Sequence, residues 1–277
     1  MTAACVIGHR VGYSRSPTLH GYWLRTMGIA GRYDLVDLDP EAFAAFLTQL
    51  RAHGYVGANV TKPHKQAAFA LLDGRDAAAA AIGAVNTVWL DGDRLIGSNT
   101  DVAGFLANLD AQAPGWDAAA GPAVVLGAGG AGRAVVYGLR TRGVDVALVN
   151  RTVGRAEVLA HHFGPGVTSH PWSGIPSLLA EARLLVNATL LGATGQEALA
   201  IELSGLPGAA VVCELNYVPL ESELLRAARQ RGLRAVDGLG MLMHQAVPAF
   251  AHFFGVRPVV TPELRAALEA TLAEAPR

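Results

Sequence analysis

The sequence of 277 residues has little cysteine and no excess of charge of either sign. It holds 2 cysteines, and its 22 basic and 23 acidic residues leave a net charge of -1. Cys5 and Cys213 lie in apolar stretches without a CxxC pattern, so we expect buried thiols in a reducing compartment. Because no global field would draw the protein to nucleic acid or anionic lipid, any acidic ligand must be recognised locally.

Long apolar runs and metal-ligand patterns are missing as well. The N-terminus lacks the basic start and apolar core of a signal peptide, and the low-polarity run 77–85 is too short to span a bilayer. We therefore expect a cytoplasmic protein without a membrane partner. The 9 histidines form no HExxH or similar spacing, and the adjacent His161 and His162 would point to different faces of a helix. We expect no metal.

The chain is long enough for two domains, each with its own core. Short β-branched runs alternate with longer helical patterns, which predicts βαβ units on mostly parallel sheets. The expected strands include 4–7, 56–60, 123–126, 144–149, 184–187 and 209–213, and the expected helices include 18–27, 41–52, 133–142, 155–162 and 241–254. The breaker-rich segment 113–122 indicates a connection into a second unit. We place one domain at 1–101 plus 239–277 and the other at 102–238.

A glycine-rich turn joins the strand 123–126 to the helix that follows it. The turn reads Gly127-Ala-Gly-Gly-Ala-Gly132, in the strand-turn-helix context that a dinucleotide-binding GxGxxG pattern needs. Glycines allow close approach of the backbone, and the helix N-terminus offers N–H groups to a pyrophosphate. An ordinary glycine turn is the alternative, but this context favours nucleotide binding.

The next strand ends in Asn150-Arg151-Thr152, where an NAD-specific site would carry an acidic residue. Arg151 is suited to pair with a 2′-phosphate and to stack on adenine, and Arg155 supplies a second charge. The alternative is that Thr152 caps the following helix and both arginines are solvated.

Polar clusters follow several predicted strands of the first domain. They are Ser14-Arg-Ser-Pro17, Asn59-Val-Thr-Lys-Pro-His-Lys65, Ala84-Val-Asn-Thr87 and Asn99-Thr-Asp101. Each has a structural explanation when taken alone: Ser16 as an N-cap before Pro17, Lys65 as a solvated side chain, and Asp101 as the cap of a helix beginning at Val102.

Taken together and in order, these motifs resemble the shikimate dehydrogenase family from about residue 5 to residue 255. The ordered set also includes Gly-Ala-Gly-Gly-Ala, Asn-Arg-Thr and, from Asp237, Asp-Gly-Leu-Gly-Met-Leu-x-x-Gln-Ala. The resemblance implies an N-terminal α/β substrate domain and a Rossmann-type NADP domain on either side of a cleft. It also implies reversible reduction of 3-dehydroshikimate to shikimate, in the biosynthesis of chorismate and the aromatic amino acids.

The same resemblance assigns roles at matching positions. Lys65 and Asp101 would form the catalytic pair and also contact the substrate. The other substrate-binding residues would be Ser14 and Ser16 for the carboxylate, Thr61, Asn86 and Gln245 for ring hydroxyls, and Tyr217. The cofactor contacts would be Gly127, Ala128, Gly129, Gly130, Ala131, Asn150, Arg151, Thr152, Arg155, Leu215 and Gly238.

Four positions depart from the family's usual pattern: Tyr13, Val102, Leu190 and Glu214 stand where His, Gly, Ser and Asp are common. None of them belongs to the implied catalytic pair. An enzyme acting on quinate or an amino-substituted shikimate would use the same scaffold. A catalytically silent nucleotide-binding sensor is the alternative from another class, because a fold alone does not establish activity. A homodimer is a further possibility that the sequence leaves open.

Overall fold

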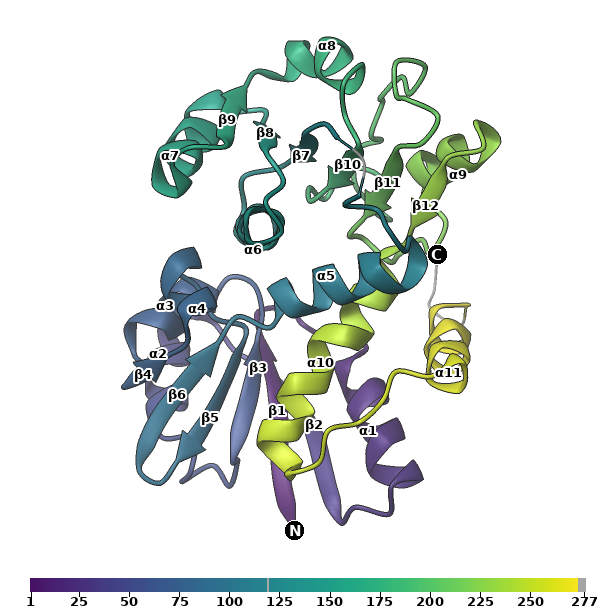
Figure 1. The fold of residues 1–277 in the computed structure, drawn as a ribbon. Coiled ribbons are helices and arrows are strands. Elements are labelled where there is room, and N and C mark those ends of the chain that lie inside the picture. Colours follow the sequence, from purple (N-terminus) through teal and green to yellow (C-terminus); the bar gives the residue numbers. More distant parts are fainter. Residues whose placement is uncertain (119, 274–277) are drawn as a thin grey trace. The chain divides into compact units, whose positions relative to one another are not determined.

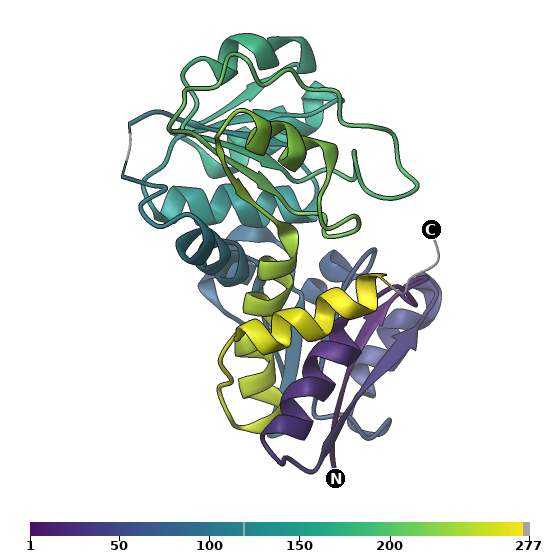
Figure 2. The ribbon, with the colours of Figure 1, turned by 90° about the vertical axis from the view of Figure 1, so that its right-hand side faces the viewer.

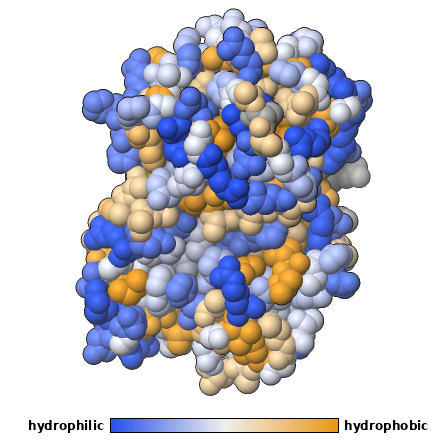
Figure 3. Space-filling model, viewed as in Figure 1, coloured by the Kyte–Doolittle hydropathy of each residue, from blue (hydrophilic) through white to orange (hydrophobic). Residues whose placement is uncertain are grey.

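The computed structural model describes residues 1–118 and 120–273. Residue 119, in the breaker-rich connection, and residues 274–277 of the expected C-terminal segment lie outside the described residues. The chain divides into two compact units, one formed by Met1–Asp101 with Leu242–Ala273 and the other by Val102–Met241 (Figure 1). Each unit contains a six-stranded sheet. Hydrophilic and apolar side chains are interspersed on the visible surface (Figure 3).

The sheet of the first unit has the strand order β2-β1-β3-β5-β6-β4. Its strands are β1 (Thr2–Gly8), β2 (Gly31–Asp37), β3 (Gly57–Val60), β4 (Gly74–Arg75), β5 (Thr87–Asp91) and β6 (Arg94–Ser98). Pairs β1–β2, β1–β3 and β4–β6 are parallel, whereas β5 runs antiparallel to both β3 and β6. The predicted mostly parallel sheet is confirmed.

The hairpin between β5 and β6 was missing from the predicted elements, although its turn carries a sequence signal. Gly92, whose φ is 59°, supplies the left-handed turn between Asp91 and Asp93, and Asp-Gly is a known hairpin signal.

Helices cover both faces of this first sheet. They are α1 (Ser16–Thr26), α2 (Pro40–Thr48), α3 (Lys65–Ala70), α4 (Ala77–Ile82), α11 (Pro262–Ala273) and most of α10 (Gly238–Phe254). On one face, Phe43 and Leu47 of α2 pack in a buried cluster with Ile7 and Val60. On the other face, Gly57 allows close approach of Phe253 from α10. Helix α11 lies beside α1 (Figure 2).

The second unit is a doubly wound sheet in which every pair of neighbouring strands is parallel. Its order is β12-β11-β10-β7-β8-β9, which is the Rossmann arrangement. The strands are β7 (Ala123–Leu126), β8 (Val146–Val149), β9 (Val167–His170), β10 (Leu184–Asn187), β11 (Val211–Glu214) and β12 (Arg234–Val236). The helices are α5 (Asp101–Gln112), α6 (Gly130–Thr141), α7 (Val153–Phe163), the 3-10 helix η1 (Trp172–Gly174), α8 (Ile175–Leu179) and α9 (Glu223–Gln230).

Alternate residues of β7 enter two different cores. Val125 belongs to one buried cluster, and Val124 and Leu126 belong to another. Burial on both faces explains the continuous apolar runs of these strands, because a sheet covered on both sides has no solvated face. The predicted Rossmann-type fold is confirmed.

Most predicted segments differ from the structure by a few residues at one or both ends, and two of these differences have a clear cause. The strand expected at 144–149 begins at Val146, because Val144 donates its N–H to Leu139 in the turn that ends α6. The helix expected at 41–52 ends at Thr48, and the chain then turns so that Tyr55 donates to the Leu50 carbonyl. Within the described residues, no helix combines the length and apolar character needed to cross a membrane.

Candidate active site

The first unit gathers its polar residues where β1 and β3 end. Thr61 follows β3 and donates its N–H to the Ile7 carbonyl at 2.9 Å, and its methyl group lies close against Gly8. Lys65 then begins α3. The carboxyl ends of parallel strands are the usual place for ligands in α/β sheets, so this edge is a candidate binding site.

Lys65 and Asp101 form an ion pair at this edge. The Lys65 Nζ lies 2.5 Å from Asp101 Oδ2, and the side chains are 21% and 11% exposed. Asp101 is the first residue of α5, but its carboxylate faces side chains, because its other oxygen accepts a hydrogen bond from Asn86 Nδ2 at 2.9 Å. The pair is therefore anchored in the fold and still accessible to a small molecule.

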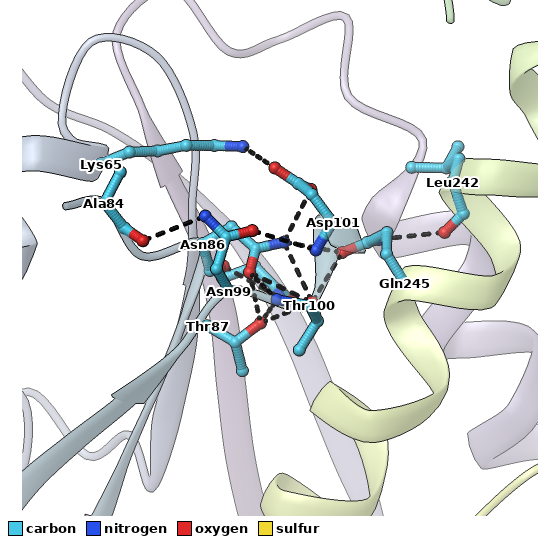
Figure 4. A network of polar contacts seen from close by, with 10 residues as sticks. Lys65, Ala84, Asn86, Thr87, Asn99, Thr100, Asp101, Leu242 and Gln245 are labelled. Atoms are coloured by element: carbon cyan, nitrogen blue, oxygen red, sulfur yellow. Dashed lines mark hydrogen bonds and ion pairs between the residues drawn. The ribbon is translucent and has the colours of Figure 1, made fainter. Parts of the chain in front are cut away.

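Asn86 is the centre of the surrounding network (Figure 4). Besides Asp101, its Nδ2 lies within hydrogen-bonding distance of Thr100 Oγ1, at 3.0 Å, and Gln245 Oε1, at 3.3 Å. Its Oδ1 accepts the Thr100 backbone N–H at 2.7 Å. Gln245 is itself held by donating to the Leu242 carbonyl of α10 at 2.9 Å. The structure thus brings together four of the predicted residues: Lys65, Asn86, Asp101 and Gln245.

Sequence reasoning missed a second layer behind Asn86. Asn59 donates to Thr87 Oγ1 at 3.0 Å and to the Asn86 carbonyl at 3.2 Å, and it accepts from the Tyr33 hydroxyl at 2.6 Å. Asn59, Thr87 and Thr100 are all buried. Three of these residues belong to the polar motifs already noted, so their clustering was the available signal, whereas nothing in the sequence singled out Tyr33.

Ser14 and Ser16 lie at the start of α1. Ser16 is the first residue of the helix, and its N–H donates to Ser14 Oγ at 3.3 Å. The hydroxyl that accepts this N–H belongs to Ser14, and Arg15 occupies the N-cap position without a side-chain cap. The structural alternative, in which Ser16 is the N-cap, is therefore wrong. Ser16 is 7% exposed.

In the second unit, the glycine-rich turn has the shape that a dinucleotide requires. Gly127 has a φ of 105°, and a Cβ at Gly132 would overlap the carbonyl oxygen of Gly127. A Cβ at Gly129 or Gly130 would meet nothing within 4 Å, so the start of α6 is open to a ligand. Backbone N–H groups at such a helix start bind phosphate, and the residues present fit a pyrophosphate.

The residues after β8 divide into a structural group and an exposed group. Asn150 Oδ1 accepts the Ala128 N–H at 3.2 Å, which holds the glycine-rich turn. Arg151, Thr152 and Arg155 are exposed, and the Arg151 guanidinium lies 3.5 Å from the Glu197 carboxylate. Thr152 is the N-cap residue of α7, but its side chain makes no cap hydrogen bond. The alternative interpretation therefore holds for the position of Thr152 at the start of α7, but not for a side-chain cap.

The remaining predicted residues also lie in the second unit. Leu215 and Gly238 are in contact, because a Cβ at Gly238 would overlap the Leu215 carbonyl. Ala131 lies in the first turn of α6. Tyr217 is half-buried in the loop after β11.

The four departures from the family pattern lie in different environments. Tyr13 and Leu190 are 55% and 50% exposed, whereas Val102 is buried. Glu214 is fully buried. Burial raises its pKa to about 7, although hydrogen bonds from Asn187 and Asn216 act to lower the pKa.

Across residues 1–118 and 120–273, no three His, Cys, Asp or Glu side chains gather as a metal site.

One unit has a Rossmann sheet with an open glycine turn, and the other has a half-buried lysine–aspartate pair. Together they define a class of dinucleotide-binding proteins equipped for acid–base chemistry. The family models agree. Residues 6–88 match the shikimate dehydrogenase substrate binding domain, and residues 111–194 match shikimate / quinate 5-dehydrogenase. The chain belongs to the shikimate dehydrogenase family.

Individual relatives cover nearly the whole chain. An NADP(+) shikimate dehydrogenase from Rhodopseudomonas palustris is 57% identical over 98% of this chain and 97% of its own length. Shikimate 5-dehydrogenase from Thermus thermophilus, solved in complex with NADP(H) and shikimate, is 38% identical with a TM-score of 0.86 and 99% coverage of each chain. Quinate dehydrogenase from Corynebacterium glutamicum, in complex with NAD, is 33% identical with a TM-score of 0.87 and covers 98% and 99%.

Proposed function

We propose that this chain catalyses the reversible, NADPH-dependent reduction of 3-dehydroshikimate to shikimate, a step in chorismate and aromatic amino acid biosynthesis. The observation that carries the proposal is the Lys65–Asp101 pair, held 2.5 Å apart at the end of the first sheet. The name of the Rhodopseudomonas palustris relative, at 57% identity, supports the same activity. In this proposal, 1–101 with 239–277 is the substrate domain and 102–238 is the NADP domain. The cleft between them stays a prediction.

Lys65 and Asp101 act as the catalytic pair. Reduction of a ring carbonyl develops negative charge on oxygen, and the Lys65 ammonium stabilises this charge and donates the proton. Asp101 orients the ammonium through their ion pair and accepts a hydrogen bond from the reacting hydroxyl. Because the two groups are directly coupled, they titrate and act as a unit.

Neutral polar groups bind the rest of the substrate. Thr61, Asn86 and Gln245 bind the ring hydroxyls, and Ser14 and Ser16 bind the carboxylate. The hydrogen bonds from Asn86 to Asp101, Thr100 and Gln245 fix its amide before the substrate arrives, which lowers the entropic cost of binding. Tyr217 of the second unit completes the set.

When bound, NADPH would supply the hydride for the reduction, and NADP⁺ would accept it in the reverse direction. Gly127, Ala128, Gly129, Gly130 and Ala131 hold the pyrophosphate through backbone N–H groups. Asn150 keeps this turn in shape, and the exposed cations Arg151 and Arg155, with Thr152, bind the 2′-phosphate. Leu215 and Gly238 contact the remainder of the cofactor.

The test is the absorbance of NADPH, followed with purified protein and 3-dehydroshikimate. Consumption of NADPH that depends on this substrate supports the proposal, and its absence at saturating concentrations favours the silent sensor. Initial rates with shikimate, quinate and aminoshikimate, each with NADP and with NAD, separate the related activities. The quinate alternative is kept because a quinate dehydrogenase shares the fold at a TM-score of 0.87.

Two further expectations stay predictions. We propose a cytoplasmic location, which the free, buried cysteines Cys5 and Cys213 support, and cell fractionation tests it. A homodimer is tested by the mass of the protein in solution.

A further inference from the structure

A buried carboxylate joins the two loops that follow β10 and β11. Glu214, the last residue of β11, is fully buried. Its Oε2 accepts from Asn187 Nδ2 at 2.8 Å and from Ser222 Oγ at 3.5 Å. Its Oε1 accepts from both the backbone N–H and the Nδ2 of Asn216, each at 2.8 Å. Four donors from three residues therefore converge on one side chain.

Asn187 connects Glu214 to the loop after β10. Its Oδ1 accepts from the Thr189 N–H at 3.1 Å and from the Thr189 hydroxyl at 2.7 Å. The same hydroxyl oxygen accepts the Leu191 N–H at 3.0 Å. Asn216 links the two loops directly by donating to the Thr189 carbonyl at 2.9 Å. The two loops are thus tied to each other as well as to Glu214.

Both loops contact residues proposed to bind the cofactor. A Cβ at Gly127 would lie 3.0 Å from the Ala188 carbonyl oxygen and from Thr189 Cγ2, so the loop after β10 packs against the glycine-rich turn. Leu215 follows Glu214 directly, and its carbonyl is packed against Gly238. A shift of either loop would therefore reach the cofactor site without any direct contact between Glu214 and the cofactor.

We propose that Glu214 is a positioning residue that holds the loops 188–192 and 215–219 in the arrangement that binds NADP. The effect on NADP binding rests on the proposed function, whereas the effect on the two loops rests only on the hydrogen bonds of Glu214. Above its pKa of about 7, the ionised carboxylate is suited to the task because both of its oxygens only accept, so the variants are compared above this pH. A glutamine of the same shape would turn an NH₂ group toward at least one donor and leave part of the network unpaired.

The decisive comparison is between Glu214→Gln, which keeps the volume, and Glu214→Asp, which keeps two accepting oxygens on a shorter stem. If Glu214 served only to fill space, Gln would be tolerated better than Asp. The proposal expects the reverse order. Leaving a buried donor unpaired corresponds to roughly a tenfold or larger effect, so NADPH should bind Glu214→Gln about tenfold more weakly, and Glu214→Asp should retain most of the affinity.

Arg183 offers a matched control at the opposite edge of the same sheet. It precedes β10, and its side chain donates to the carbonyls of Gly121 and of Asp117, the latter at 2.8 Å. Arg183→Met removes comparable hydrogen bonds and should lower thermal stability. It should leave NADPH affinity unchanged, because the contacts it removes lie away from the loops 188–192 and 215–219.

Two measurements on the full chain decide the matter: NADPH binding by fluorescence titration, and amide hydrogen exchange without any ligand. In Glu214→Gln, the Thr189, Leu191 and Asn216 amides should exchange at least tenfold faster, whereas Arg183→Met should not change them selectively. Unchanged exchange and affinity in Glu214→Gln, or a greater loss in Glu214→Asp, would overturn the inference. A protein inactive with 3-dehydroshikimate would refute the proposed function separately, because the exchange experiment needs no substrate.

Discussion

Replacing Lys65 with Met removes the ammonium group while it keeps an unbranched side chain of similar length. The wild-type Nζ lies 2.5 Å from Asp101 Oδ2, so the variant loses both the group that faces the reacting oxygen and the partner of Asp101. The Asp101 carboxylate keeps its hydrogen bond from Asn86 at 2.9 Å. Because the carboxylate is still satisfied in part, we expect the variant to fold.

The expected loss lies in turnover. A positioned acid or base contributes roughly 10²–10⁴ in rate, so kcat should fall about a hundredfold or more, equivalent to about 3 kcal/mol in the barrier. Shikimate affinity should change much less, because Ser14, Ser16 and Gln245 are untouched. Asp101→Asn should also be impaired. The double variant should be little worse than the more severe single variant, since residues that act as a unit are not additive.

The assay follows NADPH absorbance for kcat, and calorimetry measures shikimate binding directly. Lys62→Met is the matched control, because Lys62 is an exposed lysine on the same segment and lies outside the network. Near-normal turnover in Lys65→Met would remove this lysine from the mechanism. If the loss of kcat in the double variant equalled the product of the losses in Lys65→Met and Asp101→Asn, the joint action of the two residues would be refuted.

Three other predictions test the two proposed binding sites and the pH dependence of stability. Changing Ser14 and Ser16 together to Ala should raise the Michaelis constant for shikimate and spare NADP affinity; a loss of thermal stability alone would favour a purely structural role. Arg151→Ala should weaken NADP by roughly one to two powers of ten and NAD only slightly, whereas equal weakening of both would exclude the phosphate contact. Burial lowers the pKa of His20 to about 3, and neither of its ring nitrogens has a hydrogen-bond partner. Below pH 6.5 the unfolded chain binds a proton that the folded chain does not. The free energy of unfolding therefore decreases as the pH is lowered from 6.5 to about 3. Between pH 7.5 and 5 the wild type should therefore lose about 2 kcal/mol more unfolding free energy than His20→Leu, as measured by urea unfolding; parallel losses would contradict this.

The sequence was most informative where a local rule determines the structure. Strand β7, the glycine-rich turn and α6 follow from apolar β-branched residues, glycine spacing and helix propensity, all within one short segment. Strand β10 has the bounds predicted for it, Leu184–Asn187, because a strand buried on both faces is apolar throughout. The predictions were weaker at turns, as at Val144, because a β-branched residue there satisfies the pattern of a strand without belonging to one.

The candidate site could be predicted in part. Motif order indicated Lys65, Asn86, Asp101 and Gln245, but it could not specify which atoms meet. Asn86 and Gln245 are 159 positions apart, and their contact depends on the return of α10 to the first unit. The donors that converge on Glu214 had no signal either, because one carboxylate in an apolar strand does not reveal which donors the neighbouring loops will bring to it.

The proposed site would also account for the selection of an anionic substrate by a nearly neutral chain. An ion pair such as Lys65–Asp101 has no net charge, so in the proposed mechanism its lysine is reserved for the reacting oxygen and is not the receptor of the carboxylate. In the same proposal, the hydroxyl groups of Ser14 and Ser16 bind the carboxylate at the start of α1, an 11-residue helix, whose N-terminal dipole favours a negative charge. Neutral donors at a fixed position discriminate by geometry and do not attract every anion. In this proposal, different residues at one edge of the same sheet bind the substrate carboxylate and transfer the proton. Asn86 can therefore fix the lysine–aspartate geometry regardless of how the carboxylate is bound.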